Sequence, residues 1–70
     1  MKKLIAIIHS GSDLSKEAKF VNNHRNDGSY FYVYGNRITI SNPFKELTEN
    51  EQLASLNWFL GARSYSIEKQ

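Results

Sequence analysis

Gly35 and Asn36 separate two runs of residues that favour β-strands. Residues 29–34 are almost entirely aromatic or β-branched, and residues 37–41 alternate between polar and apolar side chains. Both patterns are typical of strands. Gly35 supplies the positive φ angle that a two-residue hairpin turn requires. The sequence therefore predicts an antiparallel hairpin over residues 29–41, and the other segments have to pack around it.

A strand and a helix are predicted before the hairpin. Residues 4–8 form a continuous apolar run, which is typical of a strand buried on both faces. The polar stretch 10–13 then offers oxygens that can cap the N-terminus of a helix. The helix that follows carries Leu14, Ala18, Val21 and Arg25 on one face.

The end of this helix is predicted between Asn22 and His24, because the turn signal Asn26-Asp27-Gly28 follows. Residues 22–27 are polar throughout, and we expect them to form an exposed, solvated turn. A recognition loop is the alternative interpretation of this stretch.

A second helix and a last strand are predicted after the hairpin. Thr48 and Glu51 have the spacing of a capping box, in which each side chain accepts from the backbone of the other. Gly61 fits the C-terminal stop of the helix. The expected apolar face of this helix consists of Leu53, Leu56, Phe59 and Leu60. Residues 63–68 alternate again, with Tyr65 and Ile67 on one side, and predict a short strand.

The predicted order is β-α-β-β-α-β, which is the order of the ferredoxin-like fold. In this fold two helices cover one face of a four-stranded antiparallel sheet, with the first and third strands in the middle. The very apolar first strand and the half-polar last strand agree with that placement. We therefore expect residues 1–70 to form a single α+β domain of this class, although a fold does not determine a function.

Composition limits the possible functions. The 70-residue chain is 40% apolar, has a net charge of +2 and contains no cysteine, which excludes disulfides and thiolate chemistry. Small secreted domains usually carry disulfides, so we expect a cytoplasmic protein. The apolar run 4–8 is too short for a signal peptide or a membrane span, and no membrane association is expected. A domain of this size buries only about 60% of its unfolded surface, which favours a partner or a homodimer.

The open face of the sheet is the first candidate site. Four apolar residues are expected to face the helices: Phe31, Val33, Ile38 and Ile40. Five residues would then face outward as partner-binding residues: Tyr30, Tyr32, Tyr34, Arg37 and Thr39. An exposed aromatic and aliphatic face is typical of an interface with another protein or a second copy. The alternative is that the tyrosines only stabilise an edge strand through cross-strand pairs.

Single-stranded RNA is a second candidate ligand for the same face, because tyrosines can stack on bases and basic residues can bind phosphate. RNA-recognition motifs carry their aromatic residues on the two central strands, however, and this chain has none there. The small net charge also gives weak attraction to phosphate. Nucleic acid is therefore the second choice.

Trp58 is the second candidate site, because it lies opposite the apolar face of its helix. An exposed tryptophan is typical of a binding hot spot, so Trp58 joins the predicted partner-binding residues. The alternative is that a loop covers the indole or that Trp58 turns into the core. A Trp58→Ala variant that loses binding rather than folding stability would favour the first interpretation.

Nothing in the sequence forms a catalytic or metal-binding constellation. His9 and His24 have no histidine at metal-ligand spacing, and we expect them to be solvated or hydrogen-bonded. Residues 9–12 resemble an anion-binding loop only weakly, because they lack the lysine of a phosphate-binding loop and Asp13 would repel phosphate. Three carboxylates gather where the helix dipole already favours acids: Glu46, Glu49 and Glu51. We therefore expect no metal, no cofactor and no enzymatic activity.

These observations predict a small, non-enzymatic protein-binding module. It would regulate or inhibit a larger protein by covering part of its surface, as virus-encoded accessory proteins do. The predicted contacts are the outward tyrosines with Arg37 and Thr39, together with Trp58.

Overall fold

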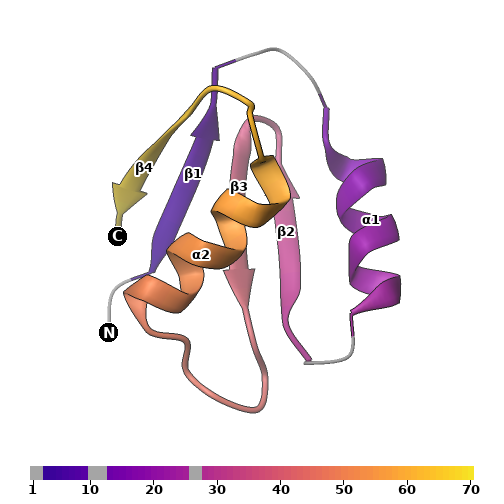
Figure 1. Cartoon of the computed structure of the whole chain (residues 1–70), viewed down its shortest axis with the longest axis vertical. Coiled ribbons are helices and arrows are strands. Elements are labelled where there is room, and N and C mark those ends of the chain that lie inside the picture. Colours follow the sequence, from indigo (N-terminus) through magenta and orange to yellow (C-terminus); the bar gives the residue numbers. More distant parts are fainter. Residues whose placement is uncertain (1–2, 10–12, 26–27) are drawn as a thin grey trace.

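The elements of the chain follow the predicted order. A computed structural model describes residues 3–9, 13–25 and 28–70 (Figure 1). The elements are β1 (Leu4–Ile8), α1 (Ser15–His24), β2 (Tyr30–Tyr34), β3 (Arg37–Ser41), α2 (Glu49–Leu60) and β4 (Tyr65–Lys69). This confirms the ferredoxin-like α+β class. The predicted cap at residues 10–12, the candidate anion loop that includes them and the turn residues Asn26 and Asp27 lie outside the described residues.

One four-stranded sheet has the order β2-β3-β1-β4, and every neighbouring pair is antiparallel. β1 and β3 are therefore central and β2 and β4 are edges, as predicted. The hairpin between β2 and β3 turns at Gly35, whose φ angle is 61°. Tyr34 pairs with Arg37 across this turn, which fixes the register of the whole hairpin.

Both helices bury their apolar residues against one side of the sheet. Figure 1 shows α2 in front of β3 and β1, while α1 lies along β2. The predicted inward residues Phe31, Ile38 and Ile40 are buried there, and Val33 packs against them. Leu14 directly precedes α1 and Ala18 lies within it. Both belong to the same core cluster as the buried residues of α2. The side chains of both helices thus complete a single hydrophobic core.

The predicted apolar face of α2 is wrong at Leu53, which is 43% exposed. The inward position belongs to Gln52, one residue earlier in the helix. Its side-chain Oε1 accepts the backbone N–H of Leu4 at 2.9 Å, and its Nε2 donates to the carbonyl of Leu47 at 3.1 Å. A buried amide is tolerated because both of its polar ends are paired.

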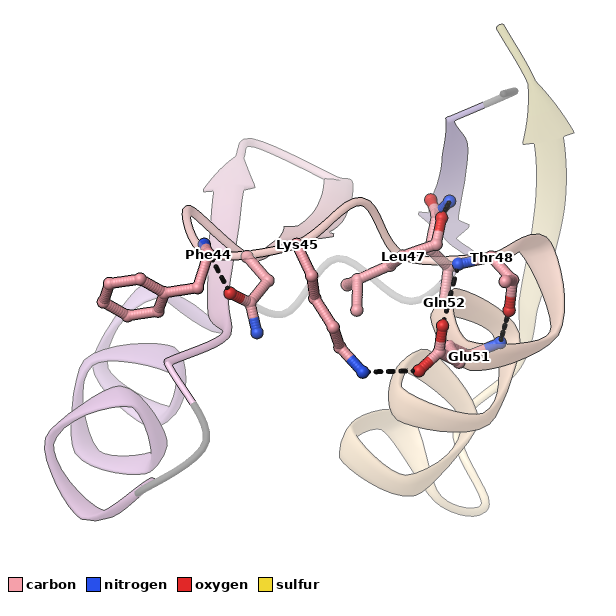
Figure 2. A network of polar contacts seen from close by, with 7 residues as sticks. Phe44, Lys45, Leu47, Thr48, Glu51 and Gln52 are labelled. Carbon is pink, nitrogen blue, oxygen red and sulfur yellow. Dashed lines mark hydrogen bonds and ion pairs between the residues drawn. The ribbon is translucent and has the colours of Figure 1, made fainter.

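The ends of α2 are as predicted. The hydroxyl of Thr48 accepts the backbone N–H of Glu51 at 3.1 Å, and a carboxylate oxygen of Glu51 accepts the backbone N–H of Thr48 at 3.0 Å. Figure 2 shows this capping box, with Lys45 reaching the other carboxylate oxygen of Glu51 at 2.8 Å. At the other end Gly61 adopts a φ of 58° and closes the helix.

The N-terminus of α1 uses only part of the predicted polar cap. Asp13 accepts the backbone N–H of Ser15 at 2.9 Å and its hydroxyl at 2.7 Å. These bonds lower the pKa of the Asp13 carboxyl below its ordinary value. Leu14 takes the cap position itself, and its hydrocarbon side chain, which has no donor or acceptor, is buried in the core.

The polar stretch 22–27 is not the fully exposed turn that was predicted. Asn22 and Arg25 are both half-buried. The side chain of Asn22 bonds the backbone of Phe31, and the guanidinium of Arg25 lies over the Phe31 ring at 5.1 Å. Partners on β2 therefore draw these side chains inward, and for Arg25 this agrees with its predicted place on the helical face of Leu14 and Ala18.

Strand β4 begins two residues later than predicted. Arg63 belongs to the turn after α2, because its backbone N–H donates to the carbonyl of Leu60 at 3.1 Å. Its guanidinium bonds Glu17 of α1 at 2.8 Å. Tyr65 and Ile67 both pack against the core, which confirms that they share one side of the strand. None of the helices in the described part of the chain is long and apolar enough to cross a membrane.

Candidate functional site

The outward face of the sheet carries no helix, because both helices pack on the opposite face (Figure 1). The alternation along β2 confirms the predicted orientation: Phe31 is buried, whereas the tyrosines on either side of it are exposed. Tyr34 is 71% exposed and Tyr32 is 43% exposed. Each ring therefore presents a large apolar surface to solvent, while the backbone of its residue is fixed in β2.

The strand register brings the predicted partner-binding residues of the sheet together. Tyr32 pairs with Thr39, and Tyr34 pairs with Arg37. Arg37 in turn pairs with Ile7 of β1. The rings of Tyr30 and Tyr32 lie 6.3 Å apart between centroids. These residues form one continuous surface, which we call the tyrosine face.

A shallow depression of about 590 Å³ crosses the tyrosine face. Eight residues line it: Lys3, Ile5, Tyr32, Tyr34, Arg37, Thr39, Ser41 and Gln70. Ile5 is only 9% exposed, although it belongs to the face without helices, and it forms an apolar floor. Tyr30 is not among the lining residues and lies beyond the margin of the depression.

Positive charge borders this depression. Lys3 and Arg37 belong to the lining, and no aspartate or glutamate does. Glu68 approaches Arg37 at 3.7 Å, and both side chains are about half exposed. An exposed pair at this separation contributes little to stability and exchanges readily with other ions. Arg37 is thus available to an anionic group of a ligand.

Four lining residues were not among the predicted site residues: Lys3, Ile5, Ser41 and Gln70. Ser41 follows Arg37 and Thr39 in the alternation of its strand, which places it on the same face. Ile5 carried a usable signal, because the first strand is apolar on both faces and one set of its side chains must face away from the helices. Lys3 and Gln70 carried no signal in the sequence that would place them at this site. They meet only because β1 and β4 pair, with the N–H of Gln70 bonded to the carbonyl of Lys3 at 2.9 Å.

Trp58 does not belong to the tyrosine face. It is 63% exposed, as its place on the helical wheel indicated, but α2 lies on the other side of the sheet. The guanidinium of Arg25 lies 5.5 Å from the centroid of the Trp58 ring. The role of Trp58 in binding a partner stays a prediction, and a partner contact at Trp58 would be separate from the tyrosine face.

The two histidines are hydrogen-bonded. His9 bonds the hydroxyl of Ser66 through Nε2 at 2.7 Å and that of Ser64 through Nδ1 at 3.2 Å. His24 bonds the carbonyl of Phe20 within α1 at 2.8 Å. Across residues 3–9, 13–25 and 28–70, no three side chains of the metal-ligating types come together.

Comparison with protein families, curated proteins and solved structures found no match for this chain. Its function is therefore argued from the sequence and from the geometry of the tyrosine face.

Proposed function

We propose that this protein is a small, non-enzymatic binding module whose tyrosine face engages another protein. The observation that carries the proposal is the helix-free sheet face, on which exposed tyrosines of β2 line the same depression as a nearly buried isoleucine of β1. Tyrosine and arginine are enriched at protein interfaces, because each offers a large contact area together with polar groups. The strand fixes the backbone of the tyrosines, so binding costs little backbone conformational entropy.

The lining of the depression suggests the chemistry of the partner. An apolar side chain of the partner would contact Ile5 next to Thr39 and Tyr32. An acidic group on one side of it would meet Lys3, and one on the other side would meet Arg37 and displace Glu68 from its loose pair with Arg37. We therefore propose a partner surface in which an apolar residue is flanked by an aspartate or glutamate.

Binding of this kind would regulate or inhibit a larger protein by covering its surface. A rigid sheet presents its contacts without rearrangement, so the bound module excludes other ligands from the area that it covers. Virus-encoded accessory proteins act in this way, and we propose the same mode of action here.

The test is a pull-down from the native host with the tagged full-length protein and a variant of the tyrosine face. Tyr34→Ser combined with Arg37→Ala removes the most exposed ring of the tyrosine face and one cation. A matched control on the helix side combines Phe20→Ser with Lys19→Ala, which again removes one exposed ring and one cation. We expect one protein to be retained by the wild type and the control and to be lost on the tyrosine-face variant.

Single-stranded nucleic acid is the second candidate, favoured by the meeting of two tyrosines and two cations in one depression. Stacking of bases on Tyr32 and Tyr34 would be steered by Arg37. The same pull-down decides between the two, because it is repeated with nuclease. Retention that disappears with nuclease would replace the protein-binding proposal, and retention that survives the tyrosine-face substitutions would place the contact elsewhere on the molecule.

A further inference from the structure

The two edge strands, β2 and β4, differ in whether their outward backbone groups are hydrogen-bonded. Every edge strand directs alternate backbone N–H and C=O groups outward, where they can pair with another strand. On β2 the outward groups of Phe31 are already bonded. The side-chain amide of Asn22 accepts its N–H at 2.9 Å and donates to its C=O at 3.0 Å, so α1 blocks this edge at Phe31.

Two bonds at the ends of the β1–β4 ladder show which groups of β4 point outward. The N–H of His9 bonds the carbonyl of Ser64, and the N–H of Gln70 bonds the carbonyl of Lys3. Hydrogen-bonded pairs alternate along an antiparallel ladder, so Ser66 and Glu68 bond to β1. The backbones of Tyr65, Ile67 and Lys69 therefore face away from the sheet.

These outward groups of β4 have no partner within the described part of the chain. α2 contacts side chains of β4 and not its outward backbone groups. Asn57 accepts from the hydroxyl of Tyr65 at 3.0 Å, and Glu49 pairs with Lys69 at 3.1 Å. No helix lies along β4 in the way that α1 lies along β2 (Figure 1). The strand thus presents three consecutive outward donor–acceptor positions.

We infer that β4 pairs antiparallel with β4 of a second copy of this chain, about a two-fold axis at Ile67. The outward positions 65, 67 and 69 are symmetric about residue 67, so all of them pair at once. On the helix side of the sheet Ile67 meets the partner's Ile67, with Lys69 opposite the partner's Tyr65. Apolar and aromatic–cation pairs of this kind stabilise neighbouring strands.

The same register avoids direct charge repulsion. On the tyrosine-face side Glu68 lies opposite the partner's Ser66, whose hydroxyl can donate to the carboxylate. Glu68 keeps its pair with Arg37, and Lys69 keeps its pair with Glu49. Charged residues usually protect an edge strand from pairing, but here neither charge faces its like directly. This complementarity favours a second copy as the occupant.

The first test is the mass of the full-length protein in solution, measured by sedimentation equilibrium across the micromolar to millimolar range. We expect a monomer–dimer equilibrium. Lys69→Pro removes an outward N–H but leaves the ladder to β1 intact, because Lys69 does not bond to β1. It should weaken dimerisation about tenfold relative to Lys69→Ala, because two-fold symmetry removes two backbone bonds at once.

The second test fixes the register, and the cysteine-free chain makes it simple. Positions 66 and 68 would form a non-hydrogen-bonded pair with Cα atoms about 4.5 Å apart, which suits a disulfide. A mixture of Ser66→Cys and Glu68→Cys chains should cross-link far more than either variant alone. A monomer at every concentration overturns the inference, and so does equal cross-linking of Ser66→Cys with itself. The Tyr34→Ser, Arg37→Ala variant should still dimerise, which keeps this test separate from the proposed function.

Discussion

Trp58 and Phe59 are neighbours in α2 with opposite environments. Phe59 is 8% exposed and stacks on Phe31 with ring centroids 4.6 Å apart, whereas Trp58 is largely exposed and contacts Arg25. We expect Phe59→Ala to lower the free energy of unfolding by about 3–5 kcal/mol. Trp58→Ala should cost only about 1 kcal/mol, the size of an exposed cation–π contact. Urea denaturation of the two variants measures the difference, and equal losses would mean that Trp58 belongs to the core.

Glu51 is the residue whose titration should be visible in stability. The hydrogen bond from Lys45, followed by that from the Thr48 backbone, lowers its pKa from 4.5 to about 2. The unfolded chain therefore takes up a proton before the folded one does as the pH falls. The stabilisation is complete above about pH 5 and is lost progressively as the pH falls through the range down to about 2.

The corresponding measurement is the urea midpoint at about pH 6 and about pH 3, for the wild type and for Glu51→Gln. The wild type should lose more stability between the two pH values than the variant, which has no carboxylate to titrate. The remaining acid sensitivity of the variant includes Asp13, whose pKa is also lowered. Identical pH dependence in the two proteins would contradict the assigned role of Glu51.

At the scale of elements, the side chain of Asn22 hydrogen-bonds α1 to the edge of β2. Asn22→Ala would leave the N–H and C=O of Phe31 without partners in a half-buried position, at a cost of about 1–3 kcal/mol. The matched control is Asn23→Ala, one residue later on the same helix, where the side chain is exposed. Chemical denaturation should find the control close to the wild type. Equal stability of both variants would mean that water replaces the amide at no cost.

The elements themselves were predictable because their signals are local. The Gly35 turn and the Thr48–Glu51 capping box each depend on residues within four positions of one another. Gln52 and Asn22 were missed for the opposite reason. Each is drawn inward by backbone groups of a strand outside its own helix, nine residues away for the bond between Asn22 and Phe31 and 48 residues away for the bond between Gln52 and Leu4. A periodicity of apolar residues cannot show a buried amide whose partners are supplied by tertiary structure.

At the scale of the molecule, the outward direction of the tyrosines was predictable, but the shape of the tyrosine face was not. Alternation along β2 and β3 placed Tyr32, Tyr34 and Arg37 on one side. The depression between them depends on β1 and β4 as well, since its lining includes residues close to both ends of the described chain. Its apolar floor and its positive border follow from the order of the strands.

The bonded backbone of Phe31 also limits how large an assembly can become. A molecule with two open edges can add neighbours indefinitely, and the product is a fibre. Because Asn22 occupies the outward groups of Phe31, β2 does not offer the uninterrupted run of outward groups that β4 offers. Two copies joined through β4 would expose only these interrupted β2 edges, which disfavours further growth. The side chain of Asn22 thereby favours a finite particle over an open polymer.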